Sequence, residues 1–60
     1  MYQVTIYNNI TMREVGPIFF SGEGEEYENL TKARAAAALW ISRQGNKNDL
    51  QIKSQIVGCL

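Results

Sequence analysis

The chain has 60 residues, which allows one domain at most (residues 1–60), and a domain of this size buries only about 60% of the surface that its unfolded chain exposes. Six Lys and Arg residues balance six Asp and Glu residues, so the chain is not built to coat nucleic acid. It has no histidine and a single cysteine, Cys59, which excludes internal disulfides and the usual zinc frameworks. Self-association or a well-packed small core must therefore supply the stability, and we favour a homo-oligomer, most simply a dimer.

Membrane insertion and secretion are not indicated. No window approaches the run of about 18 apolar residues that a membrane-spanning helix needs. The first residues, MYQVTIYNN, have the pattern of a strand and lack the positive charge and the apolar core of a signal peptide. We therefore expect a cytoplasmic location with no membrane contact.

Residues 2–7 (YQVTIY) predict the first strand. Their side chains alternate, with Val4 and Ile6 on one face, and the segment is rich in β-branched and aromatic types. Asn8 and Asn9 follow as a turn signal, because Asn tolerates a positive φ better than most residues. The chain should therefore reverse its direction here.

The second strand admits two interpretations. A two-residue hairpin loop would place Ile10 and Met12 on one face together with Tyr7, whereas a longer loop would lead into a strand at residues 15–20. The Gly-Pro pair at residues 16–17 interrupts this segment, and proline has no N–H to donate to a neighbouring strand. We therefore expect this part of the chain at an edge of the sheet or at a bulge.

Residues 29–45 (NLTKARAAAALWISRQG) predict a helix, because five alanines among Leu, Lys, Arg and Trp give a high helix propensity. Asn29 or Thr31 is the expected N-cap, and Gly45 is the expected first residue beyond the C-cap. At about 100° per residue, one side of the helix carries an apolar stripe that should face the sheet. The stripe consists of Leu30, Ala33, Ala36, Ala37, Trp40 and Ile41.

Residues 46–50 form a polar connection, and the alternation in residues 51–57 (QIKSQIV) predicts a last strand. The resulting order is strand, strand, helix, strand. It predicts an α+β fold in which a small antiparallel three-stranded sheet (β-β-α-β) carries one helix on a face. Because the helix returns the chain to its starting end, the third strand should lie beside the first, in the order 2-1-3.

Four of the six acidic residues lie within residues 23–28, just before the helix. Glu25, Glu26 and Glu28 should stand at or ahead of the helix N-terminus, where the dipole favours negative charge by about 0.3–1 kcal/mol each. Arg43 should stand in the last turn, where positive charge is favoured. A calcium or magnesium site is an alternative, but the segment lacks the regularly spaced Asp and Asn ligands of such loops. We interpret it as a solvated helix entrance without a metal; docking of a basic partner is the remaining alternative.

The residue inventory argues against catalysis. Without histidine, the usual acid–base pairs and triads cannot form, and Cys59 has no basic neighbour in the sequence. Residues 21–24 (SGEG) superficially suggest a phosphate-binding loop, but they lack the Gly-Lys-Ser/Thr ending, and their glutamate would repel phosphate. We therefore expect no enzyme, no cofactor and no small-molecule substrate.

Two apolar surfaces are candidates for protein contact. On the helix, Leu39 projects nearly opposite Leu30, and the flanking alanines would let another helix approach closely. On the sheet, one helix covers one face, so apolar side chains of the first hairpin on the other face would need a partner. The predicted interface residues are Tyr7, Ile10, Met12, Ala35, Ala38 and Leu39. The alternative is a lone exposed leucine and a sheet that residues 58–60 cover.

Nucleic acid is the alternative partner, because strand aromatics stack single-stranded bases and the C-terminal half of the chain is basic. The predicted contacts are Tyr2, Phe19, Lys32, Arg34, Arg43, Lys47 and Lys53. No motif set points to a known family. The leading hypothesis is a small non-enzymatic protein-interaction module that self-associates, binds a protein partner, or both, as a regulator, inhibitor or assembly accessory. Weak nucleic-acid binding is the second hypothesis.

Overall fold

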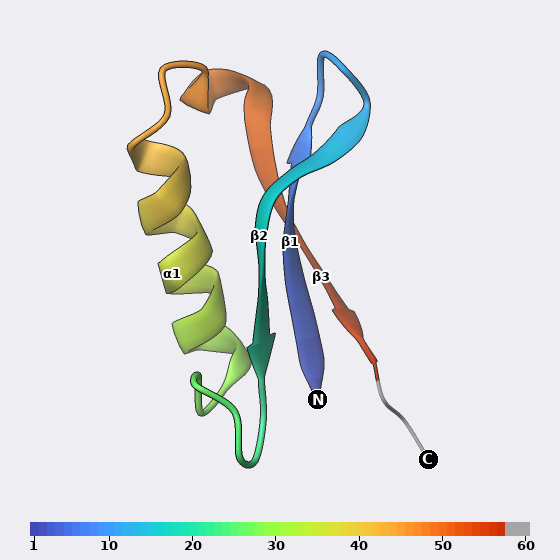
Figure 1. Cartoon of the computed structure of the whole chain (residues 1–60), viewed down its shortest axis with the longest axis vertical. Helices are drawn as coiled ribbons and strands as arrows, with labels where there is room; N and C mark the ends of the chain where they lie inside the picture. Colours follow the sequence, from blue (N-terminus) through green and yellow to red (C-terminus); the bar gives the residue numbers. More distant parts are fainter. Residues whose placement is uncertain (58–60) are drawn as a thin grey trace.

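Three strands and one main helix make up the fold. The structure is a computed structural model, which describes residues 1–57. Its elements, in chain order, are strand β1 (Tyr2–Asn8), strand β2 (Arg13–Ser21), helix α1 (Leu30–Ser42), the short 3-10 helix η1 (Lys47–Asp49) and strand β3 (Leu50–Ile56). The strands form one antiparallel sheet in the order β2-β1-β3, and α1 packs across one face of it (Figure 1). The predicted α+β fold and the predicted strand order are confirmed.

The core lies between α1 and the central strand β1. Alternation in β1 turns Val4 and Ile6 toward the helix, where Ala33 and Ala37 meet them, and all four side chains are fully buried. Alanines on this side of α1 permit a close approach of the helix to the sheet, as the predicted stripe required. Partly buried side chains from β2, α1, β3 and the loop before α1 complete the cluster: Val15, Phe19, Tyr27, Leu30, Trp40, Ile41, Leu50 and Ile52.

The β1–β2 hairpin has the longer of the two predicted loops. β1 ends at Asn8, and residues 9–12 form the turn. Asn8 acts through its side chain, because its Oδ1 accepts hydrogen bonds from the N–H groups of Ile10 and Thr11 at 2.8 and 3.0 Å. The positive φ of the turn, 61°, falls on Met12 and not on an asparagine. This loop removes Ile10 and Met12 from the strands.

β2 is an edge strand with a bulge. Val4 pairs with Phe19. The next pair, Ile6 with Val15, leaves residues 16–18 of β2 opposite a single residue of β1. An edge strand tolerates a proline because one of its sides has no neighbouring strand to bond. The Gly-Pro pair therefore lies both at an edge and at a bulge, as the sequence predicted.

α1 begins where the sequence predicts and ends earlier. Asn29 is the N-cap, and its side chain accepts a hydrogen bond from the Lys32 N–H at 3.0 Å. Arg43 is the C-cap, so it lies just outside the last turn, in which we expected it. The first residue past the cap is then residue 44, and the prediction of Gly45 at that position is wrong. The N–H groups of Arg43 and the next residue donate to carbonyls three positions back, at 3.2 and 2.9 Å. These bonds tighten the end of the helix before the glycine is reached.

β3 closes the sheet on the other side of β1. Its pairing with β1 is uninterrupted from Leu50 to Ile56, and Leu50 and Ile52 face α1. The Asn9 N–H donates to the Asp49 carbonyl at 2.8 Å, which joins the hairpin loop to η1. β3 is therefore a regular strand, in contrast to β2.

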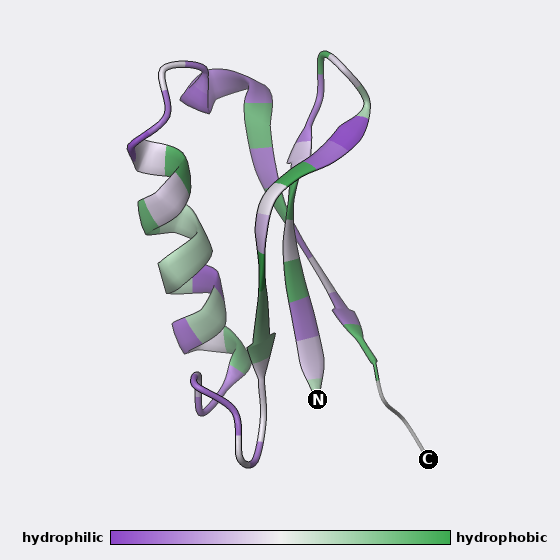
Figure 2. Cartoon of the chain, in the orientation of Figure 1, coloured by the Kyte–Doolittle hydropathy of each residue, from purple (hydrophilic) through white to green (hydrophobic). Residues whose placement is uncertain are grey.

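The hydropathy of the chain follows this arrangement. Hydrophobic and hydrophilic residues are interleaved along the strands, and the connections at both ends of α1 are hydrophilic (Figure 2). α1 has 13 residues. Within residues 1–57, no helix is both long enough and apolar enough to cross a membrane.

Candidate functional site

A groove lies between α1 and β2, and we call it the α1–β2 groove. It is an open hollow of about 230 Å³, and most of its lining side chains are apolar or aromatic. The lining residues are Pro17, Phe19, Tyr27, Ala36, Leu39, Trp40 and Arg43. The groove is therefore built from the edge strand, the loop before the helix, and the side of α1 that faces β2.

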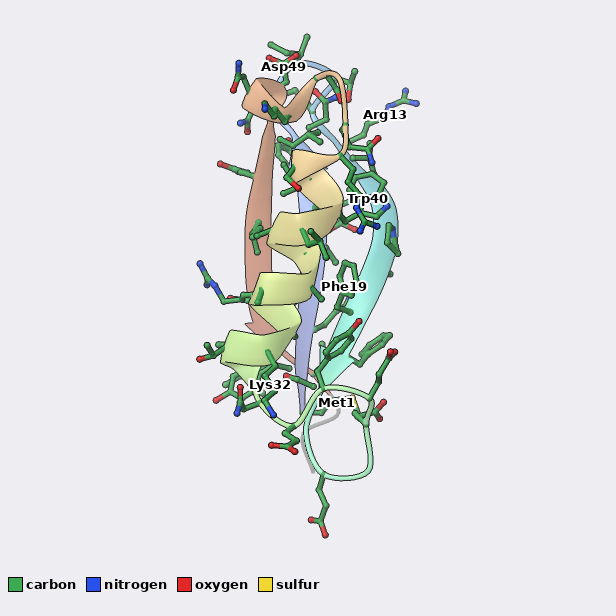
Figure 3. The ribbon with its side chains drawn as sticks, turned by 90° about the vertical axis from the view of Figure 1, so that its left-hand side faces the viewer. Met1, Arg13, Phe19, Lys32, Trp40 and Asp49 are labelled. Atoms are coloured by element: carbon green, nitrogen blue, oxygen red, sulfur yellow. The ribbon has the colours of Figure 1, made fainter. Side chains whose placement is uncertain are left out.

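The bulge in β2 makes room for Trp40. Gly16 has a φ of 74°, and a Cβ placed there would lie 2.7 Å from the Trp40 indole. Glycine suits this position for two reasons: it adopts a positive φ without strain, and it has no Cβ to collide with the indole. The indole therefore packs directly against the backbone of β2, and Figure 3 shows it on the β2 side of α1, above Phe19.

The loop before α1 supplies a second aromatic side chain. The Gly22 N–H donates to the Tyr27 carbonyl at 3.0 Å, and Ser21 forms an isolated parallel bridge with Tyr27. The Tyr27 ring then meets Phe19 edge to face, with ring centroids 5.8 Å apart. Such pairs contribute about 0.5–1.5 kcal/mol beyond the area that they bury. The loop is thereby fixed against β2, and Tyr27 becomes one wall of the groove.

Leu39 stands at the rim of the groove. Its side chain is 54% exposed, as expected for a residue on the outer side of α1. It is the one predicted interface residue that lines the groove; Ala35 and Ala38 are exposed on α1 but outside the lining. The groove therefore includes Leu39 of the predicted helix surface and leaves out its two alanines.

A second hollow continues the groove along β2. It is an open hollow of about 260 Å³ and shares Pro17, Phe19 and Tyr27 with the groove. Ile18 and Phe20 also line it, and they are 48% and 39% exposed. The groove and this hollow adjoin along the edge of β2 and are lined by both apolar and polar groups; together we call them the extended groove.

Opposite charges mark the two ends of the extended groove. Arg43, after the C-terminus of α1, lies at one end, and Glu25 and Glu26, before its N-terminus, line the other. Within residues 1–57, none of these three forms an ion pair; the pair present joins Lys32 to Glu28 at 3.0 Å. Both ends therefore carry charged side chains without an ion-pair partner among the described residues.

The uncovered face of the sheet is more polar than its sequence suggested. The Tyr7 ring lies under the Lys53 Nζ, 3.8 Å from the ring centroid, and its hydroxyl is 3.7 Å from the Met12 sulfur. Glutamines of β1 and β3 meet at 3.5 Å. Because the hairpin loop is long, Ile10 lies in that loop and is 71% exposed. The structure thus brings Tyr7 and Met12 together but separates Ile10 from the strands.

The predicted nucleic-acid contacts are divided between the two sides of the sheet. Phe19 is half-buried against Tyr27 on the helix side, and Arg34 donates to the Ser54 hydroxyl at 3.4 Å there. Lys53 lies on the uncovered side, over Tyr7. Tyr2 lies in the first position of β1, whereas Lys47 begins η1. These residues do not form one common surface.

The acidic segment and the tail complete the list of predicted sites. In the part of the chain that the structure describes, no three Asp, Glu or Cys side chains converge to hold a metal ion. Residues 58–60, which include Cys59 and the tail considered as a cover for the sheet, lie outside the described residues. The lining of the α1–β2 groove contains no thiol and no carboxylate, and its one charged group is the Arg43 guanidinium.

Sequence reasoning missed most of this lining. Pro17 marked β2 as an edge, but nothing local connects it with Trp40, which the helical stripe assigned to the core. Tyr27 lay in a segment interpreted only through its charge. No family model, no curated protein and no solved structure matches this chain.

Proposed function

We propose that the chain is a small non-enzymatic protein-interaction module and that the extended groove is its binding surface. It binds a second copy of itself, a different protein, or both, and it acts through occlusion or scaffolding as a regulator, inhibitor or assembly accessory. The observation that carries the proposal is the exposure of Leu39 at the rim of an apolar groove with aromatic walls.

The composition of the groove suits a protein partner. Trp, Tyr and Arg are enriched among the residues that dominate protein–protein binding, and Trp40, Tyr27 and Arg43 all line the groove. Burying a leucine side chain fully contributes about 1.5–3 kcal/mol relative to leaving it exposed. Ile18 and Phe20, two exposed apolar side chains of the edge strand β2, line the neighbouring hollow. A partner that covered both would bury Leu39 of α1 together with exposed apolar side chains of β2.

The test is the solution mass of the chain by light scattering, across a concentration series at low and high salt. We expect an assembly that persists in high salt, because apolar burial changes little with ionic strength. Leu39→Glu should weaken it by roughly tenfold to a hundredfold while the circular dichroism of the fold is unchanged. An assembly that Leu39→Glu leaves intact would contradict the groove as the interface.

Met12→Glu is the matched control for this experiment. Met12 is 67% exposed, the substitution is of the same kind, and the residue belongs to the rival surface beside Tyr7. We expect it to leave the assembly unchanged. Loss of the assembly in Met12→Glu, and not in Leu39→Glu, would transfer the interface to the hairpin and the uncovered face of the sheet.

Weak single-stranded nucleic-acid binding is the second candidate, and one contact favours it. Lys53 over the Tyr7 ring joins a cation and an aromatic face on the uncovered side of the sheet. Base stacking on such a side chain contributes about 1–3 kcal/mol per base. Fluorescence anisotropy with a labelled oligouridylate would test it: a real complex weakens steeply with salt and is lost in Tyr7→Ala. Binding that is absent at low salt would eliminate this candidate.

A further inference from the structure

The extended groove is complementary to itself in charge as well as in apolar surface. Arg43 lies beyond the C-terminal end of α1, and Glu25 and Glu26 lie before its N-terminal end. The 13 residues of α1 separate these charges by about 20 Å at 1.5 Å per residue. Apolar and aromatic side chains, with polar groups among them, line the interval between these charges. A partner that covers the whole surface must therefore offer an anion at one end, a cation at the other and apolar side chains between.

We infer that the occupant of the extended groove is a second copy of this chain, related to the first by a two-fold axis that sets the two α1 helices antiparallel. The inference rests on the proposed function and specifies its partner. In a two-fold interface, every contact between two different residues is made twice. Arg43 of each copy then meets Glu25 and Glu26 of the other, and Leu39 of each copy enters the groove opposite it.

The small core of the chain favours this occupant. Four apolar side chains are fully buried, and the remaining members of the cluster are only partly covered. A stable interface buries about 800 Å² of each partner, which is about a fifth of the 4286 Å² that the described chain exposes. α1, which lines one side of the extended groove, runs along the longest dimension of the molecule (Figure 1).

Two copies could instead join by pairing their β2 edge strands, but the irregular backbone of β2 disfavours this arrangement. The bulge at residues 16–18 disrupts the register, and Pro17 has no N–H to donate. Main-chain pairing across this edge would therefore fail near its middle. Side-chain packing over the groove, with an ion pair at each end, avoids that interruption.

Charge reversal tests the arrangement through the dissociation constant of the dimer, measured by light scattering and analytical ultracentrifugation. Arg43→Glu alone and Glu25→Lys with Glu26→Lys should each weaken the dimer by roughly tenfold, because like charges then oppose each other at both ends. All three substitutions in one chain should restore the wild-type constant. An equimolar mixture of the two reversed variants should form a heterodimer tighter than either homodimer.

The matched control reverses one cation and one anion outside the lining, Lys47→Glu and Glu14→Lys. We expect these two to leave the dissociation constant unchanged, singly and mixed. Equal effects from the control pair would show general charge attraction and would overturn the two-fold arrangement.

Two further outcomes separate this inference from the function on which it rests. If Leu39→Glu dissolves the assembly but charge reversal has no effect, the groove remains the interface and the antiparallel arrangement is wrong. If Leu39→Glu leaves the dimer intact, both the groove and the arrangement are wrong. A wild-type chain that is monomeric up to about 1 mM overturns the second copy as the occupant and leaves the groove to a different protein.

Discussion

The two edges of the sheet are built in opposite ways. β2 has nine residues, a bulge, a glycine at positive φ and a proline, whereas β3 has seven residues that pair with β1 without interruption. The irregular edge forms the groove, because the bulge accepts the Trp40 indole and lets the helix side of β2 carry Phe19 against Tyr27. The regular edge pairs with β1 along its whole length and exposes mostly polar side chains. In this molecule, the bulge in β2 is what makes room for the α1–β2 groove.

The largest expected effect comes from filling the space at the bulge. Gly16→Val adds a β-branched side chain at a φ of 74° and at 2.7 Å from Trp40. We expect it to lower the free energy of unfolding by about 3 kcal/mol, from left-handed strain and overpacking combined. For a chain of this length the total is only about 3–9 kcal/mol, so urea denaturation should show much of the stability lost.

Gly24→Val is the control for that substitution. Gly24 has a φ of 83°, but a Cβ there meets nothing within 4 Å. It should cost about 1–2 kcal/mol, from backbone strain alone. Equal losses at the two glycines would mean that Trp40 moves aside freely and that the bulge is not fitted to it.

A smaller effect should distinguish the two edge strands through their helix-facing side chains. Phe19 of β2 and Ile52 of β3 are both partly buried against the core. We expect Phe19→Ala to cost about 2–3 kcal/mol and Ile52→Ala about 1–2 kcal/mol, less than truncations in a fully buried core because both sites are partly exposed. Phe19→Ala should also weaken self-association, measured by light scattering, whereas Ile52→Ala should not. Identical effects on self-association would remove the functional difference between the edges.

The smallest expected effect on stability concerns how each edge avoids pairing with other chains. Lys53→Thr removes the charge of β3 and its contact with Tyr7, which contributes about 0.5–1 kcal/mol at an exposed site. We expect faster aggregation on mild heating, because charge protects an otherwise regular edge. Pro17→Thr restores an N–H to β2 but keeps the bulge, so aggregation should not accelerate. Rapid aggregation of Pro17→Thr would show that the proline, and not the bulge, protects that edge.

The features that the sequence predicted correctly are those with a local signal. Alternation in residues 2–7 and 51–57 predicted two strands, and Asn29 predicted the start of α1, because these signals are local. The end of α1 was placed too late, since the tight hydrogen bonds after Trp40 and Ile41 leave no mark in composition. The hairpin loop stayed ambiguous because Asn8 stabilises the turn by accepting hydrogen bonds and not by a positive φ.

The groove was harder to predict than the fold, because it depends on contacts between distant residues. Gly16 was recognised as a strand breaker, and Trp40 as a large side chain at the end of a helical stripe. The contact between Gly16 and Trp40 depends on the register of β2 with β1 and on the position of α1. Neither can be read from one segment of the sequence. Leu39 was identified because exposure on a helix is a local property. Its neighbours across the groove were not.

The position of β1 between β2 and β3 has a consequence for the order of folding. β1 is joined to β2 by a short turn. Its pairing with β3, in contrast, joins residues far apart in the sequence: Tyr2 pairs with Ile56, and even the pair closest in sequence joins Asn8 to Leu50. Closing the second loop costs more chain entropy than closing the first. We expect the hairpin to form in the folding transition state and β3 to dock later. Substitutions in the turn should then slow refolding, whereas substitutions in β3 should mainly accelerate unfolding in stopped-flow experiments.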